Sequence, residues 1–293
     1  MRIHVNGVLL FFDVEGAKLV PDGPSLSEKP TLILLHGGPG FDHSSFKPYF
    51  SQFADIAQVI YLDHRGNGRS DRGSPQDWTL NQWADDVAAF CEVLGIEKPI
   101  VLGHSFGGMV AMSYATRHPH LPGGLILSST SARHTPARVL DRFEELGGPA
   151  VRKAAGQFWQ DPTAATWAVY TETALPWYGR NQWPADAFQR IHLNLEVLFH
   201  FARDEFRRFN LLPDLHQVRC PTLVLGGALD PMCPIEDQED IVRALPDGLV
   251  RFECFDQCGH GVFRDVPAGA ARVIREFLQT SSGYPHSETR ATD

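Results

Sequence analysis

The sequence predicts an α/β protein with a mostly parallel central sheet, helices on both faces of that sheet, and an inserted helical cap. Short continuous runs of apolar residues recur along the chain, and such runs are typical of parallel strands buried on both faces. Segments with helical periodicity separate the runs. Between residues 131 and 214 the runs stop and helical periods dominate. A chain of 293 residues with 43% hydrophobic content can bury one large core and an inserted subdomain.

The predicted strands and helices follow in order from local patterns. Residues 2–15 predict two short strands joined by the turn Asn6-Gly7, whereas residues 16–30, rich in glycine, proline, serine and charge, predict a loop. Continuous apolar runs predict further strands at 31–35, 57–62, 100–104, 125–127, 222–226 and 250–255. Helical spacing, with capping and stop signals, predicts helices at 80–94, from 106 to about 118, and at 268–278.

The domain organisation follows from the same change of pattern. Residues 1–130 and 215–280 are expected to form the core, 131–214 the helical cap, and the polar segment 281–293 a loose tail. Four of the six tryptophans and many other aromatic residues fall within the cap segment. These aromatics can line a pocket over the core or pack the cap helices together, and the sequence leaves both roles open.

Composition limits the partners and the compartment. The net charge is −9 and no basic block occurs, so neither nucleic acid nor an anionic membrane surface is expected as a partner. The five cysteines are odd in number and no pair has the spacing of a metal site, which is typical of reduced thiols in the cytoplasm. We find no pattern of a signal peptide or membrane span and expect a cytoplasmic protein.

A nucleophile motif, Gly103-His104-Ser105-Phe106-Gly107, lies between a predicted strand and a predicted helix. A sharp turn there would expose the serine hydroxyl at the carboxyl end of the sheet. The glycines two residues before and after the serine would keep the strand and the helix from clashing. Ser105 is therefore the predicted nucleophile, and an ordinary helix entry is the alternative.

Two backbone amides are predicted to form an oxyanion hole beside this serine. The amide of Phe106 starts the helix and points at an oxyanion formed on a substrate at Ser105. The strand at 31–35 ends in the sequence His-Gly-Gly-Pro-Gly, where backbone amides can approach a ligand. We expect the amide of Gly38 to be the second donor, with that of Gly37 as the alternative. A plain tight turn without this role is the remaining possibility.

An acid and a base follow later strands. Asp230 lies just past the strand at 222–226, and His260 lies in a glycine-flanked loop after the strand at 250–255. The chain order of Ser105, Asp230 and His260 is that of a serine hydrolase triad built on a parallel sheet. A neutral histidine can take the serine proton, while the aspartate fixes its tautomer and stabilises the imidazolium. No metal and no organic cofactor is needed or indicated.

Polar residues near these motifs are expected to have supporting roles. Asp63 and His64, in a glycine-rich loop after the strand at 57–62, could serve as acid and base, but charged residues in such loops more often brace them. His36 is expected to brace the oxyanion loop. The side chain of His104 is expected to point away from the reaction.

Four stretches together resemble those of a known group of proteins. They are residues 36–40, 63–70 and 103–108, and Asp230 with Gly259-His260. The chain resembles the proline iminopeptidase-like α/β hydrolases of peptidase family S33 over about residues 25–280. The resemblance implies the α/β-hydrolase fold. His64 replaces the glutamine usual in the second stretch, and Gly-His-Ser-Phe-Gly is common among ester and lactone hydrolases.

The resemblance also implies a binding site for the amino group of the substrate. In that family, acidic residues of the cap bind this group. Glu196, in an apolar helical stretch, resembles one such position, and Glu172 is a second candidate. A carboxylate is costly to bury unless a cation meets it. The alternative is that both glutamates are surface carboxylates.

The activity implied by the resemblance is that of an aminopeptidase or amidase. It would release proline, or a small residue such as alanine, from the N-terminus of a small peptide, aminoacyl amide or ester. Biosynthetic intermediates with an apolar body are included among such substrates. A carboxylic ester or lactone hydrolase with the same triad is the alternative. A non-catalytic scaffold is disfavoured, because such proteins typically lose a member of the triad.

Overall fold

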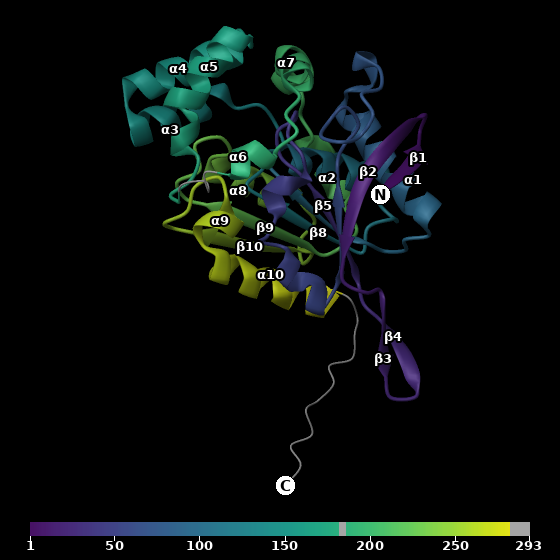
Figure 1. Ribbon diagram of the computed structural model, residues 1–293. Coiled ribbons are helices and arrows are strands. Elements are labelled where there is room, and N and C mark those ends of the chain that lie inside the picture. Colours follow the sequence, from purple (N-terminus) through teal and green to yellow (C-terminus); the bar gives the residue numbers. More distant parts are fainter. Residues whose placement is uncertain (182–185, 282–293) are drawn as a thin grey trace.

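An eight-stranded sheet runs through the protein in the order β1-β2-β6-β5-β7-β8-β9-β10 (Figure 1). The structure is a computed structural model of the chain, and it describes residues 1–181 and 186–281. The strands are β1 (Arg2–Val5), β2 (Val8–Glu15), β5 (Thr31–Leu35), β6 (Gln58–Leu62), β7 (Ile100–His104), β8 (Gly124–Ser128), β9 (Thr222–Gly227) and β10 (Val250–Phe255). β1 and β2 pair antiparallel, and β2 is antiparallel to β6. All pairs from β6 to β10 are parallel, which confirms the predicted sheet.

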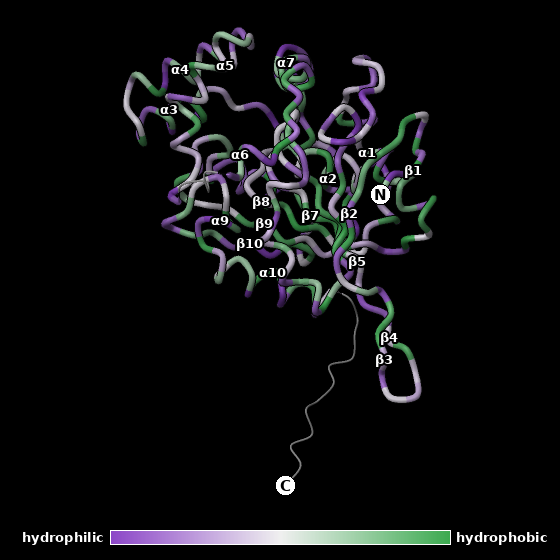
Figure 2. Tube along the Cα trace, in the orientation of Figure 1, coloured by the Kyte–Doolittle hydropathy of each residue, from purple (hydrophilic) through white to green (hydrophobic). Residues whose placement is uncertain are grey.

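Side chains of the strands alternate between two cores, one on each face of the sheet. In β5, Ile33 and Leu35 belong to the first core, whereas Leu32 and Leu34 belong to the second. This alternation follows from the two-residue repeat of a strand. Because both faces are covered, every residue of β5, β7 and β8 is buried. Figure 2 accordingly shows hydrophobic residues gathered in the central strands.

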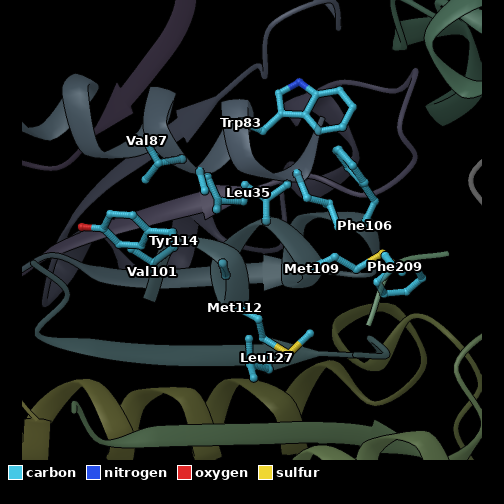
Figure 3. Close-up of a cluster of buried hydrophobic side chains, with 14 of the residues drawn as sticks. Leu35, Trp83, Val87, Val101, Phe106, Met109, Met112, Tyr114, Leu127 and Phe209 are labelled. Carbon is cyan, nitrogen blue, oxygen red and sulfur yellow. The ribbon is translucent and has the colours of Figure 1, made fainter. Parts of the chain in front are cut away.

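Helices cover both faces of the sheet. The helices of the core are α1 (Leu80–Leu94), α2 (Phe106–Arg117), α8 (Ile235–Ala244), α9 (Val262–Asp265) and α10 (Pro267–Ser281). The first core receives side chains from α1, α2 and α8, and Figure 3 shows part of it. The second core receives side chains from α9 and α10. At the start of α1, the Thr79 side chain accepts a hydrogen bond from the Gln82 N–H, as predicted.

The chain between β8 and β9 forms a separate group of helices, above the sheet in the view of Figure 1. These helices are α3 (Pro136–Gly147), α4 (Pro149–Gln160), α5 (Ala164–Thr173), α6 (Ala187–Arg190) and α7 (Leu195–Arg203). β8 and β9 are neighbours in the sheet, so the insertion leaves and re-enters the core at adjacent strands. We call residues 131–214 the cap, although its exact bounds remain a prediction. Trp183 of the cap lies outside the described residues.

The structure differs from the sequence prediction at residues 16–30. The predicted loop is instead a hairpin of β3 (Leu19–Asp22) and β4 (Ser25–Glu28), which pair with each other and not with the main sheet. Most residues of the hairpin are exposed, so it lacks the apolar alternation that predicts strands. The helices α8 and α9 also lie where no helix is predicted, because α8 is rich in acidic residues and α9 has only four residues.

Two further expectations concern the end of the chain and membranes. The loose tail predicted at 281–293 falls, from residue 282 onward, outside the described residues. Among the helices of the described residues, none is both long enough and apolar enough to cross a membrane.

Candidate active site

Ser105 stands at a sharp turn between β7 and α2. Its backbone angles are φ 54° and ψ −120°, in the positive range of φ that side chains rarely adopt. The turn requires glycine two residues before and two residues after the serine. A Cβ added at Gly103 would lie 2.2 Å from the carbonyl oxygen of Gly107, and one added at Gly107 would lie 2.0 Å from that of Leu35. The strand, turn and helix expected for a nucleophile are therefore all present.

The loops after β9 and β10 bring Asp230 and His260 together. Nδ1 of His260 lies 3.0 and 2.9 Å from the two carboxylate oxygens of Asp230. Asp230 is fully buried, and its Oδ1 also accepts hydrogen bonds from the N–H groups of Met232 and Cys233. With the Nδ1 proton donated to Asp230, Nε2 of His260 can accept a proton. Ser105 and His260 line the same cavity, so the predicted nucleophile and the predicted base face one space.

Among the described residues, one group of side chains could offer three metal ligands. Ligand atoms of Asp230, Cys233 and His260 all lie within 4.8 Å of one another. A metal ion there would compete for Nδ1 of His260, which already donates to Asp230. The arrangement therefore fits a histidine held for proton transfer better than it fits a metal site.

Three backbone N–H groups lie near Ser105. Gly37 and Gly38 line the cavity, and Phe106 begins α2 directly after the serine. Within the described residues, the N–H groups of these three residues hydrogen-bond to no other residue, so each can donate to an oxyanion. Gly38 has φ 120°, a backbone conformation that favours glycine. The expected donor Gly38 and the alternative Gly37 both remain candidates beside Phe106.

A buried histidine supports the oxyanion loop from behind. Nδ1 of His36 lies 2.8 Å from the carbonyl oxygen of Gly37, and Nε2 lies 3.3 Å from the backbone nitrogen of His64. Burial lowers the pKa of both histidines, so both rings are neutral at pH 7. A neutral His36 that donates from Nδ1 and accepts at Nε2 satisfies both contacts. The expected bracing role of His36 is confirmed.

Asp63 begins the loop that follows β6 and does not line the cavity. Its carboxylate accepts hydrogen bonds from the backbone N–H groups of His43 and Arg69, and Nδ1 of His43 lies 2.7 Å from Oδ1. Burial alone would raise the pKa of Asp63, but the hydrogen bond and charge of His43 hold it below the ordinary value. Asp63 therefore braces the loop that follows β6, as the sequence led us to expect, and His64 is also absent from the cavity wall.

His104 departs from the expectation that its side chain points away from the reaction. His104 is among the residues that line the cavity, and its ring lies 5.1 Å from that of His260. The prediction is wrong because the positive φ of Ser105 ends the regular alternation of strand side chains at this point. Nδ1 of His104 lies 3.2 Å from the carbonyl oxygen of Ser128, and burial lowers the pKa of the ring well below its ordinary value. His104 is thus a neutral ring beside the candidate base.

A cavity of about 890 Å³, counted out to its open mouth, lies over Ser105 between the core and the cap. Its wall is mostly aromatic and aliphatic. The cap contributes Trp159, Trp167, Tyr170, Leu175, Tyr178, Phe188, Leu198, Phe201 and Phe206. Other cap aromatics, such as Phe143 and Phe158, are fully buried and pack among the cap side chains. Both roles that the sequence leaves open for the aromatics are therefore found.

Glu172 and Glu196 lie away from this cavity. Both residues are exposed, and neither lines the cavity. Leu198 and Phe201 of α7 do line it. Because successive residues of a helix are rotated by about 100°, Glu196 lies on the opposite side of α7. The structure therefore does not bring the two predicted amine-binding carboxylates to Ser105.

Arg264 is the one lysine, arginine, aspartate or glutamate in the described wall of the cavity. It lies four residues after His260 and is buried. Burial lowers its pKa to about 10, so the guanidinium remains protonated at neutral pH. No local pattern distinguishes Arg264 from a surface arginine, and the sequence therefore does not predict its position.

Asp265 joins the loop of His260 to the cap. Its carboxylate accepts hydrogen bonds from the N–H of Gly259 at 2.8 Å and from the N–H groups of residues 180–181 at 3.0 Å. The N–H of His260 donates to the carbonyl oxygen of Tyr178 at 2.5 Å. The candidate base and the cap segment 178–181 are therefore held together as one unit.

Replacing Asp265 by alanine is expected to lower kcat about 10- to 100-fold, because His260 would lose its fixed position relative to Ser105. The measurement is steady-state hydrolysis of a 2-naphthyl ester, with the melting temperature followed by circular dichroism. Asp265→Glu should restore part of kcat, whereas the exposed Asp256→Ala should leave it unchanged. A folded Asp265→Ala variant with unchanged kcat would contradict this role.

Comparison with known proteins places these features in a family. A family model described as "alpha/beta hydrolase fold" matches residues 30–265. The proline iminopeptidase of Lactobacillus helveticus is 40% identical over 279 residues, which cover 86% of this chain and 90% of the relative. The solved proline iminopeptidase of Mycobacterium smegmatis is similar with a TM-score of 0.76 and 23% identity, over 96% of this chain and 98% of that one. A thermophilic esterase from Thermogutta terrifontis gives a TM-score of 0.70 and 25% identity, over 96% and 99%. The chain therefore belongs to the α/β-hydrolase fold family, among its proline iminopeptidase-like members.

Proposed function

We propose that the protein is a serine hydrolase that cleaves esters, lactones or amides of an uncharged, apolar acyl group. The observation that carries this proposal is the cavity over Ser105. Its described wall is mostly aromatic and aliphatic, and it contains no carboxylate. Apolar groups gain about 25 cal/mol for each Å² of surface removed from water, so such a wall favours an apolar acyl group.

In the proposed reaction, Ser105 attacks the carbonyl carbon of the substrate while Nε2 of His260 takes the serine proton. Asp230 holds the histidine and stabilises the imidazolium. The N–H groups of Phe106 and Gly38 stabilise the tetrahedral oxyanion, and each such donor typically contributes about 3–4 kcal/mol. His260 then gives the proton to the leaving group. Water activated by the same histidine releases the acid from the acyl-enzyme.

The main argument for an uncharged acyl group is that no carboxylate lies in the described wall of the cavity. An ammonium group inside an apolar cavity is costly unless a carboxylate meets it. Glu172 and Glu196 are exposed outside the cavity, while the protonated Arg264 lies in its wall. A cation on the substrate would therefore meet no carboxylate in the described part of the cavity wall.

The second candidate function is release of proline, or a small residue such as alanine, from the N-terminus of a small peptide or amide. It is supported by the 40% identity to a proline iminopeptidase. This function would need a carboxylate for the substrate amine, which is the role that the sequence resemblance assigns to Glu196 and Glu172. The sequence alone favours the aminopeptidase over the ester or lactone hydrolase. The lining of the cavity favours the hydrolase of apolar acyl groups instead.

We expect 2-naphthyl cyclopentanecarboxylate to be hydrolysed with a kcat/KM about 10- to 100-fold above that of L-proline 2-naphthyl ester, because the unpaired ring cation of proline is costly to bury. The two acyl groups have nearly the same shape and differ in that charge. Each rate is divided by the spontaneous rate of the same ester, which removes the difference in intrinsic reactivity. Release of 2-naphthol is followed by fluorescence.

The exposed glutamates supply the matched control for this comparison. Glu196→Gln and Glu172→Gln should leave both rates unchanged, because neither side chain lines the cavity. A preference for the prolyl ester, together with a raised KM for that ester alone in Glu196→Gln, would establish the second candidate instead.

A further inference from the structure

We infer that Asn194 of the cap is a positioning residue for the oxyanion hole. It holds Gly40, two residues after Gly38, and so fixes the direction in which the N–H of Gly38 points. The oxyanion hole is therefore complete only while this part of the cap is docked on the core. The inference rests on the proposed function in one respect, because it takes the N–H of Gly38, or that of its alternative Gly37, as an oxyanion donor.

Two asparagines hold the backbone of Gly40. Its N–H donates to Oδ1 of Asn67 at 2.5 Å, and its carbonyl oxygen accepts a hydrogen bond from the N–H of Asn194 at 2.7 Å. All three residues are buried. A buried backbone group that loses its partner costs free energy comparable to a lost hydrogen bond. Gly40 therefore cannot shift without breaking its hydrogen bond to the core or its hydrogen bond to the cap.

The side chain of Asn194 is itself anchored on the core. Its Nδ2 donates to the carbonyl oxygen of Gly66, at 2.7 Å, in the loop that follows β6. Its Oδ1 accepts a hydrogen bond from the N–H of Glu196 at 3.3 Å and so caps the start of α7. One residue thus joins the first turn of α7, the loop after β6 and, through its own N–H, the oxyanion loop.

The backbone of Asn194 lies directly against the oxyanion loop. Gly40 has φ 93°, and a Cβ added to it would lie 2.6 Å from the carbonyl oxygen of Asn194. The loop is also folded tightly on itself, since a Cβ added to Gly38 would lie 3.1 Å from the backbone nitrogens of Gly40 and Phe41. A displacement of Asn194 is therefore passed to Gly40 and from there to Gly38.

A second hydrogen bond ties the same part of the cap to the core beside this loop. The carboxylate of Asp42, which is fully buried, accepts a hydrogen bond from the N–H of His192 at 2.9 Å. The other oxyanion donor, the N–H of Phe106, belongs to the turn between β7 and α2, and none of these hydrogen bonds reaches it. Loss of the contacts at Asn194 should therefore weaken the oxyanion hole without abolishing it.

Asn194→Ser separates this role from the capping of α7. Serine can still cap the helix, but its shorter side chain cannot reach the carbonyl oxygen of Gly66. We expect kcat to fall about 10- to 100-fold while KM changes less than about twofold, because the oxyanion forms only in the transition state and loss of a whole donor costs about 10²- to 10³-fold. The loss should be the same for 2-naphthyl cyclopentanecarboxylate and L-proline 2-naphthyl ester, since both form the same oxyanion.

Inhibition by cyclopentylboronic acid provides a second readout of the oxyanion hole. The boron forms a tetrahedral adduct with the hydroxyl of a serine nucleophile and places an oxygen where the oxyanion would lie. Because such an adduct resembles the transition state, its Ki in Asn194→Ser should rise by about the factor by which kcat falls. A change that only loosened the fold would not move Ki and kcat together at constant KM.

Thr163→Ala is the matched control. Thr163 caps another cap helix, α5, where its side chain accepts a hydrogen bond from the N–H of Thr166, and it does not line the cavity. This variant should lower the melting temperature and leave kcat and Ki unchanged. An unchanged kcat in folded Asn194→Ser, a loss confined to KM, or an unchanged Ki would overturn the inference.

Asn67→Ala tests the same link from the core side. It removes the acceptor for the N–H of Gly40 and should lower kcat in the same way, so the inference stays testable even where Asn194→Ser does not fold. Parent-like kcat in folded Asn67→Ala would overturn it. The proposed function can fail separately. A protein that hydrolyses only the prolyl ester would lose the proposed acyl specificity, while a fall of kcat for that ester in Asn194→Ser would still support the positioning role.

Discussion

Replacing Ser105 by alanine is expected to lower kcat for 2-naphthyl cyclopentanecarboxylate by about 10⁴- to 10⁶-fold, the range found when the nucleophile of a serine hydrolase is removed. The loss should be this large because His260 and the oxyanion donors would have no covalent intermediate to act on. The backbone already holds Ser105 at φ 54°, and alanine can take this conformation at about the same cost. The melting temperature should therefore change little.

Ser129→Ala is the matched control for this variant. Ser129 also has a positive φ, at 47°, and its buried hydroxyl has no hydrogen-bond partner within the described residues. It lies outside the cavity wall, so activity should be retained. Residual activity above about 1% in a pure Ser105→Ala preparation would contradict an acyl-enzyme on this serine, because nucleophile removal ordinarily leaves far less.

Replacing Gly107 by alanine is expected to lower the free energy of unfolding by about 3 kcal/mol or more, at the upper end of the cost of overpacking a core. The new methyl group would lie 2.0 Å from the carbonyl oxygen of Leu35, in a central strand that has no room to move. Urea unfolding monitored by circular dichroism measures the change, and loss of soluble folded protein is the extreme result.

Gly156→Ala shows what the same change does where space is available. The nearest atoms to an added methyl group there belong to the flexible side chain of Leu140, at 3.6 Å. Gly156 lies inside α4, where alanine is favoured over glycine by about 0.5–1 kcal/mol. This variant should be as stable as the parent or slightly more stable. Equal stability of Gly107→Ala and the parent would contradict the proposed packing of the turn.

The candidate triad can be predicted from the sequence because several local signals agree. Residue type, position after an apolar run, and order along the chain all select Ser105, Asp230 and His260. In a parallel sheet the carboxyl ends of the strands meet at one edge. The strands β7, β8, β9 and β10 are consecutive in the sheet, so residues that follow three of them come together. No information about distant contacts is needed beyond the parallel sheet itself.

The cap residues cannot be predicted in the same way. A motif fixes the position of Glu196 in the chain, but it does not fix the rotation of α7 about its axis. That rotation depends on distant contacts at the start of the helix, where the N–H of Asn194 donates to Gly40 O and its side chain donates to Gly66 O. Leu198 consequently faces the cavity and Glu196 faces solvent. The tie between Asp265 and residues 180–181 likewise joins segments too far apart for any local pattern to predict.

The late position of His260 in the chain has a consequence for synthesis on the ribosome. A growing chain carries Ser105 and its turn long before it carries β10 and the loop that follows. Until β10 pairs with β9, the serine has no base, so a nascent or prematurely ended chain should be unable to hydrolyse cellular esters. For the same reason, the return of activity during refolding would report the docking of this last strand rather than the formation of the sheet as a whole.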